Sequence, residues 1–82
     1  MNYKIVPTKE FEKDFLKLDK NLQTRIIKKI NEAAEDPTRY KHMKYPWNNY
    51  CRVRIEKLRV IFRYDTKKQS LYLNKIVFGH KY

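Results

Sequence analysis

Arginines recur at even spacings in one short stretch of the chain, where Arg52 and Arg54 are two residues apart and Arg59 and Arg63 are four residues apart. A guanidinium group is always charged and carries a planar set of N–H donors that matches the oxygens of a phosphate. Apolar residues occupy most of the positions between the arginines, which is the period of a β-strand with one buried face. The stretch therefore predicts a basic sheet face that binds a polyanion.

Residues 50–63 are predicted to form a β-hairpin with a short turn centred on Glu56 and Lys57. The cross-strand pairs are then Ile55 with Leu58, Arg54 with Arg59, Val53 with Val60, and Tyr50 with Arg63. One face carries Cys51, Val53, Ile55, Leu58, Val60 and Phe62, and the other carries Tyr50, Arg52, Arg54, Arg59, Ile61 and Arg63. Like charges that face each other cost a few tenths to about 1 kcal/mol, which anion binding explains and folding alone does not. The alternative is an ordinary solvated face whose arginines extend into water.

Cleavage of RNA without a metal requires groups besides arginine. Attack of a 2′-hydroxyl on the neighbouring phosphate needs a base, cations for the developing charge, and an acid for the leaving oxygen. Arginine stays protonated and supplies only the charge, whereas histidine transfers protons near neutral pH. If the end of the last strand lies beside the basic face, His80 could be the acid or base, and Tyr82 next to Lys81 could orient or stack on a nucleotide. The alternative for His80 is an exposed terminal residue, and His42 is expected to be a loop residue or an RNA contact.

Two helices and two further strands are predicted around the hairpin. The strands are residues 3–6, closed by Pro7, and residues 70–77, where a change of phase near Lys75 indicates a bulge. The first helix follows Thr8 as its N-cap and extends to Leu18, and the second runs from residue 22 to the Asp36-Pro37 pair. The order β-α-α-β-β-β predicts one α+β domain over residues 1–82, with a two-helix hairpin on one face of a small antiparallel sheet.

Residues 37–49 have no clear period and are predicted to be a loop in which basic and aromatic residues alternate. Loops of this length are often functional, and surfaces that bind single-stranded RNA have this composition. The predicted RNA contacts are Lys41, Lys44, Trp47, Tyr50 and Arg63. A second, compatible interpretation is that Met43 and Trp47 cover the edge of the sheet.

The formal net charge of +11 is concentrated in the second half of the chain. Residues 37–82 contain 12 Lys and Arg against only Glu56 and Asp65, which favours a nucleic-acid partner. The single Cys51 excludes an intrachain disulfide, and with two scattered histidines it gives no metal-ligand spacing, so no metal or cofactor is expected. No signal peptide is visible, and no apolar run approaches the roughly 20 residues that span a bilayer. A cytoplasmic protein is expected.

The chain resembles the RelE/ParE superfamily of small toxins from toxin–antitoxin pairs. The resemblance rests on the β-α-α-β-β-β order, the Asp36-Pro37 helix end, the Tyr50-x-Arg52-x-Arg54 motif with Leu58-Arg59-Val60-Ile61-Phe62, and the Gly79-His80-Lys81 ending. It implies an endoribonuclease that cuts mRNA in the ribosomal A site by 2′-hydroxyl attack without a metal. It also implies a partner antitoxin that holds the toxin inactive, and a small acidic protein or an amphipathic helix in an apolar groove would fit this cationic chain.

The resemblance assigns roles by position. Arg52 and Arg54 match basic residues, often lysines, that act on the 2′-hydroxyl or phosphate, and Arg59 matches an arginine that stabilises the transition state. His80 and Lys81 match a catalytic His or Arg, and Tyr82 matches an aromatic that positions the nucleotide. Arginine in place of lysine removes a candidate base, which moves that role to His80, and Leu58 stands where the family often has Tyr. Two other functions remain open: a ParE-like inhibitor of DNA gyrase, and an RNA- or ribosome-binding module without activity.

Overall fold

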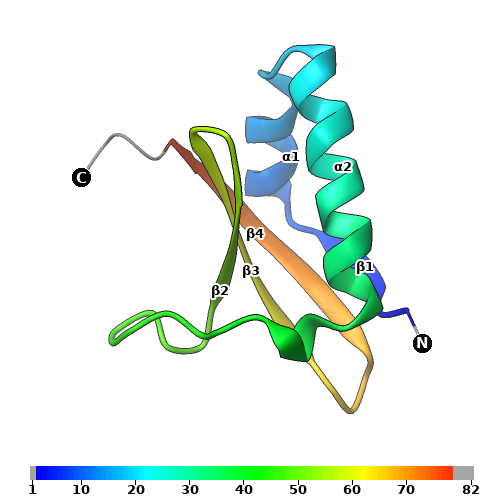
Figure 1. The fold of residues 1–82 in the computed structure, drawn as a ribbon, viewed down its shortest axis with the longest axis vertical. Coiled ribbons are helices and arrows are strands. Elements are labelled where there is room, and N and C mark those ends of the chain that lie inside the picture. The colour runs from blue at the N-terminus through cyan, green and yellow to red at the C-terminus, as the bar shows by residue number, and fades with distance from the viewer. Residues whose placement is uncertain (1, 79–82) are drawn as a thin grey trace.

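Two helices lie against one face of a four-stranded sheet in the computed structural model, which describes residues 2–78 (Figure 1). The elements in chain order are β1 (Lys4–Pro7), α1 (Lys9–Leu16), α2 (Lys20–Glu35), the short 3-10 helix η1 (Pro37–Arg39), β2 (Cys51–Ile55), β3 (Leu58–Asp65) and β4 (Ser70–Phe78). The predicted α+β class and the β-α-α-β-β-β order are confirmed.

The strands are arranged in the order β1-β4-β3-β2. The β2–β3 and β3–β4 pairs are antiparallel as predicted, but β1 runs parallel to β4, with Lys4 opposite Ser70 and Pro7 opposite Leu73. The sheet is therefore mixed and not wholly antiparallel. The direction in which β1 runs relative to β4 depends on where the long connection through both helices returns to the sheet. The four residues of β1 contain no sequence pattern that predicts this direction.

Side-chain caps fix where both helices begin. Thr8 accepts a hydrogen bond from the Phe11 N–H at the start of α1, and Asp19 accepts one from the Leu22 N–H, 2.9 Å away, at the start of α2. The first helix ends at Leu16, whereas it was predicted to extend to Leu18. The Leu18 N–H turns back to the Phe15 carbonyl, and Asp19 then opens the second helix.

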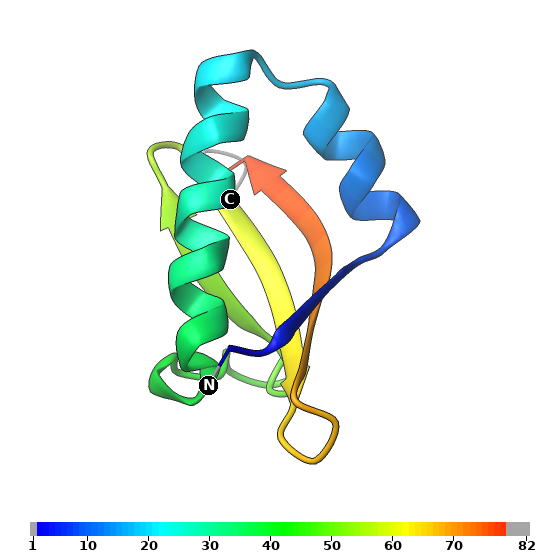
Figure 2. The same cartoon turned by 90° about the vertical axis from the view of Figure 1, so that its right-hand side faces the viewer.

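The core lies between the helices and the sheet (Figure 2). All six hairpin residues predicted to face it are buried, and they pack with Ile26, Ile30, Ala33 and Ala34 of α2 and Phe11 of α1. Nearly continuous burial of one hairpin face shows that the alternation of residue types in the sequence sets the register. Within residues 2–78, no helix is both long enough and apolar enough to cross a membrane.

Candidate nucleic-acid interface

The face of the sheet turned away from the helices carries the predicted arginines. The register places Arg54 opposite Arg59 and Arg52 opposite Ile61, as predicted. Arg52, Arg54 and Arg63 are exposed and Arg59 is half-buried. Because every second residue of a strand points to the same side, successive rungs of this face are about 7 Å apart, and the cations form a ladder along the sheet.

The last strand, β4, adds a lysine and an aromatic to this face. Lys75 lies opposite Ile61, and Tyr72 lies opposite Arg63. The guanidinium of Arg63 stacks on the ring of Tyr72, 4.4 Å from its centroid. We call the surface formed by Arg52, Arg54, Arg59, Arg63, Tyr72 and Lys75 the basic face.

Neither Tyr72 nor Lys75 was predicted as a site residue. The register of β3 against β4 shifts between Ile61 and Phe62, which leaves Asn74 as the extra residue of a bulge beside the predicted position. The bulge turns Ile76 into the core and Lys75 onto the basic face. The change of phase at Lys75 was the available signal, because it separates the outward residues of β4 from the inward ones.

The turn of the hairpin is fastened to α2. The carboxylate of Glu56 forms an ion pair with Arg25, and the Nε of Arg54 donates to the Glu56 carbonyl oxygen over 3.3 Å. Glu56 has a φ of 54°, in the left-handed region that such turns require. Both contacts are exposed, and they lie at the end of the hairpin that carries Arg54 and Arg59.

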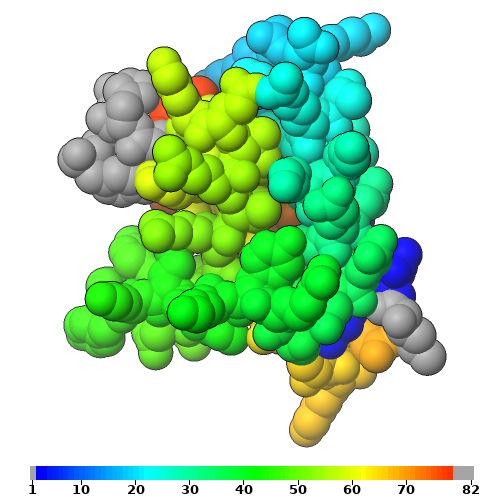
Figure 3. All heavy atoms as spheres, in the orientation of Figure 1, coloured from blue at the N-terminus to red at the C-terminus, as the bar shows by residue number. Residues whose placement is uncertain are grey.

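The loop between η1 and β2 projects beyond the sheet on the side opposite the helices (Figures 1 and 3). Its Trp47 contacts the Tyr50 ring edge-on, with centroids 6.1 Å apart, and the Nζ of Lys75 lies 5.7 Å from the indole centroid. Ile61 points to the basic face yet is only 6% exposed. Trp47 thus belongs to the same surface as Lys75, which lies on the interior strand β4.

The other predicted site residues fall into three groups. Lys41 and Lys44 are exposed on the loop, and Tyr50 is half-buried against Trp47. His42 pairs with Cys51 and contacts the Tyr64 ring, on the helix side of the sheet. His80, Lys81 and Tyr82 lie outside the described residues.

Burial raises the pKa of two titratable groups near this loop. Burial raises the pKa of the Cys51 thiol. Burial, followed by the neighbouring Cys51, Tyr3 and Asp36, raises the pKa of Tyr64. Neither group lies on the basic face, so neither supplies a base to it. Among residues 2–78, no three His, Cys, Asp or Glu side chains are grouped to hold a metal ion.

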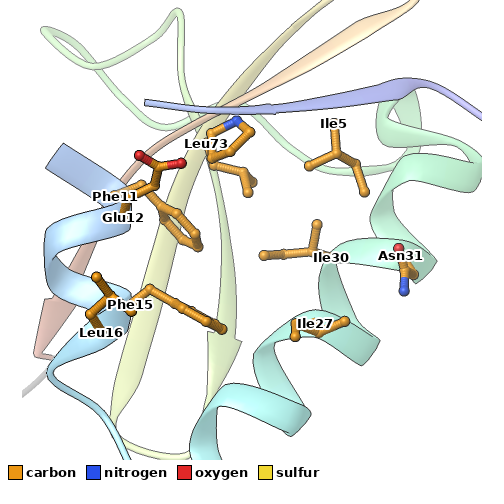
Figure 4. A pocket seen from close by; sticks show the side chains of 10 residues that line it. Ile5, Phe11, Glu12, Phe15, Leu16, Ile27, Ile30, Asn31 and Leu73 are labelled. Carbon is orange, nitrogen blue, oxygen red and sulfur yellow. The ribbon is translucent and has the colours of Figure 1, made fainter. Parts of the chain in front are cut away.

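An apolar groove of about 600 Å³ opens on the helix side of the molecule (Figure 4). Side chains from α1, α2 and β1 point into it, with Leu73 of β4 at its floor. Its apolar lining is Ile5, Pro7, Phe11, Phe15, Leu16, Ile27, Ile30 and Leu73. Leu16 is 77% exposed and Ile27 is 50% exposed, and exposed apolar residues that line one groove mark a binding surface.

A family model described as the ParE toxin of the type II toxin–antitoxin system parDE matches residues 5–75. The chain belongs to the RelE/ParE family of type II toxins. The match includes both helices, the hairpin, and β4 as far as Lys75, so the basic face and the groove are both built on the part of this RelE/ParE chain that the family model describes.

Two archaeal relatives are similar in sequence. A chain of Methanocaldococcus jannaschii named after the toxin RelE4 is 34% identical over 56 residues, which is 67% of this chain and 60% of that relative. A Methanosarcina mazei chain named only as an uncharacterized protein is 40% identical over 65 residues, which is 78% of this chain and 74% of that one. The match to the first relative therefore spans less than two thirds of its length.

Solved RelE structures share the fold at low sequence identity. The toxin–antitoxin complex RelBE2 of Mycobacterium tuberculosis contains a chain with a TM-score of 0.86 and 15% identity, covering 95% of this chain and 92% of that one. The isolated E. coli RelE toxin gives a TM-score of 0.81 at 15% identity, covering 98% and 87%. The helix pair on a four-stranded sheet is therefore the RelE-type architecture.

Proposed function

We propose that this toxin is a ribosome-dependent endoribonuclease that cleaves mRNA by metal-independent attack of a 2′-hydroxyl, and so inhibits translation. The observation that supports it best is the pair of arginines, Arg54 and Arg59, facing each other at one end of the basic face. Phe78 lies opposite Leu58 at the same end, and His80 follows it by two residues.

Each side chain has a role that its chemistry allows. Arg54 and Arg59 bind the scissile phosphate and stabilise the charge that develops on it. Arginine stays protonated, so His80 serves as the acid or base, with Lys81 beside it and Tyr82 positioning the nucleotide. Arg52 holds the substrate on the next rung.

The remaining cations extend the RNA site along the sheet. From Arg59 the basic face continues through Lys75 to the Arg63–Tyr72 pair, one rung at a time. Lys41 and Lys44 lie on the projecting loop and add positive charge beside it. A single RNA strand that follows this path meets a cation at each rung, which is the arrangement that phosphate contacts require.

The partner that holds the toxin inactive is proposed to be an antitoxin. The M. tuberculosis structure is named as a toxin–antitoxin complex. In this chain, the groove between α1 and α2 offers an apolar surface on which Leu16 and Ile27 are exposed. An amphipathic helix of an acidic antitoxin fits both this groove and the net charge of +11.

The experiment that tests the nuclease proposal is primer extension on an mRNA incubated with the purified chain, with and without ribosomes. We expect new 5′ ends that form only with ribosomes. Arg59→Ala is expected to slow their formation by roughly 100- to 1,000-fold, because it removes a charge that acts on the transition state. His80→Ala is expected to abolish cleavage. Lys28→Ala, which removes an exposed charge from α2, is the control and should cleave as the parent does.

The opposite result has a clear meaning. If no new ends form while translation continues undisturbed, the chain is not a ribosome-dependent nuclease, and a DNA supercoiling assay then tests inhibition of gyrase. If cleavage survives in both Arg59→Ala and His80→Ala, the chain is a nuclease but these residues are not its site.

A further inference from the structure

The indole of Trp47 is held in a defined place although about half of it is in water. Its side chain is 52% exposed. The Trp47 N–H donates to the Lys44 carbonyl oxygen and the Trp47 carbonyl oxygen accepts from the Tyr50 N–H, each over 2.9 Å. The Met43 N–H closes the loop by donating to the Tyr50 carbonyl oxygen over 2.8 Å. These hydrogen bonds order the backbone that carries the indole, and the Tyr50 ring contacts the indole edge-on.

The surroundings of this ring are cationic. Lys75 lies 5.7 Å from the indole centroid, and it is opposite Ile61, which in turn is opposite Arg52. Trp47 therefore stands beside the middle rung of the basic face. The Arg54 and Arg59 pair is one rung further along the sheet, about 7 Å away along the strands.

This combination selects one class of ligand. A nucleobase stacks on an aromatic ring while its neighbouring phosphates bind cations, and every base has a face that stacks. A protein partner would have to bring acidic groups to each rung, whereas a nucleic-acid strand carries a charge at every nucleotide. Duplex bases are already stacked on each other, so only an unpaired base has a free face for the indole.

We propose that Trp47 is a stacking platform for one base of a single-stranded RNA, and that Lys75 contacts a phosphate next to that base. This inference rests on the proposed function, because the RNA is the one that the basic face binds. Stacking on Trp47 anchors the strand one rung from Arg54 and Arg59 and thereby sets which phosphate lies between those two arginines.

The chain itself provides the probe, because Trp47 is its only tryptophan. A short 2′-O-methyl oligoribonucleotide of mixed sequence is suitable, since it lacks the free 2′-hydroxyl that cleavage requires. An oligomer of the same length without bases carries the same charge and is the matched ligand. We expect the oligoribonucleotide to quench Trp47 fluorescence and to bind roughly 5- to 100-fold more tightly than the baseless oligomer. The baseless oligomer should bind without quenching.

Two variants separate stacking from simple packing over Ile61. Trp47→Phe keeps an aromatic ring and should keep the preference for the oligomer with bases, measured by anisotropy of a labelled ligand. Trp47→Leu keeps apolar bulk but has no ring face, and it should lose most of this preference. Thermal unfolding of the two variants checks that they are equally folded.

The possible failures are distinguishable. If the parent binds both oligomers with equal affinity, or if Trp47→Leu keeps the preference, Trp47 is not a stacking platform, while RNA binding by the arginines stands. If neither oligomer binds, Trp47 does not stack on a base of free RNA and this inference is wrong, whereas cleavage on the ribosome is decided separately by the primer-extension assay.

Discussion

Arg54 and Arg59 form the one cross-strand pair of the described sheet in which two cations face each other. The Nε of Arg54 gains a hydrogen bond to the carbonyl oxygen of Glu56, but this contact is exposed and adds little stability. Arg52, one rung away, faces the apolar Ile61 and avoids the conflict. The Arg54–Arg59 pair is therefore a place where the fold gives up stability for a concentrated positive charge.

Replacing one of these arginines should stabilise the protein. We expect Arg54→Gln to raise the free energy of unfolding in urea by a few tenths to about 1 kcal/mol at low salt, because it removes the cross-strand repulsion. The gain should shrink as salt screens the charges. Arg52→Gln is the matched control and should show no gain. Equal effects of the two substitutions, or a loss of stability in Arg54→Gln alone, would contradict the repulsion.

At the scale of secondary-structure elements, α1 fixes the bulge of β4. The Oγ1 of Thr8 donates to the Asn74 carbonyl oxygen over 2.9 Å, and the Asp14 carboxylate accepts from the Ile76 N–H over 3.2 Å. Both contacts involve β4 beyond Leu73, where its pairing with β1 ends. The helix thus satisfies the backbone of the bulge, and the bulge turns Lys75 toward Trp47.

The double role of Thr8 predicts a measurable cost. Thr8→Val keeps the side-chain shape but removes the hydroxyl that both caps α1 and bonds to Asn74. We expect the free energy of unfolding to fall by about 1–2 kcal/mol, measured by circular dichroism in urea. Thr8→Ser keeps the hydroxyl and should lose much less. If Ser and Val cost the same, the loss comes from packing and not from the hydrogen bonds.

The sequence predicts those parts of the site that are built on elements with a clear pattern of polar and apolar residues. The hairpin register was predicted because arginines and apolar residues alternate on both arms, and a slip of one residue would bury the arginines. β1 has four residues and no such pattern, so its parallel pairing was not predicted. Tyr72 and Lys75 were not predicted, because the residues of β4 that point outward are known only once the exact position of the bulge is known. The roles of His80, Lys81 and Tyr82 stay predictions, since these residues lie outside the described range.

At the scale of the whole molecule, the sheet separates two surfaces of different character. The basic face lies on the side away from the helices, and the apolar groove lies between α1 and α2 on the other side (Figures 2 and 4). Substitutions in the groove should therefore affect the proposed antitoxin without touching RNA cleavage directly.

A charge in the groove tests this separation. The antitoxin is expected to be encoded by a neighbouring gene. Ile27→Lys is expected to weaken capture of the chain by the tagged product of that gene, after co-expression, by at least about tenfold, because an apolar contact of this size is worth about 1.5–3 kcal/mol. Cleavage in the primer-extension assay should be unchanged. Lys28→Ala, on the adjacent residue, should be captured normally. Undiminished capture of Ile27→Lys would exclude the groove as the antitoxin site.

Because β2 is an edge strand, the arginines that it contributes to the basic face also affect the solubility of the chain. The sheet has two edge strands, and β1 at one edge is short and ends at Pro7. At the other edge, the outward backbone of β2 pairs only through the His42–Cys51 bridge and meets no further strand within residues 2–78. Such strands tend to pair with strands of other molecules, and charged side chains oppose this aggregation. Arg52 and Arg54 are two of the five residues of β2. Replacing both in order to remove the proposed RNA site also removes the charges that keep copies of the chain apart, so we expect such a variant to aggregate more readily than the parent.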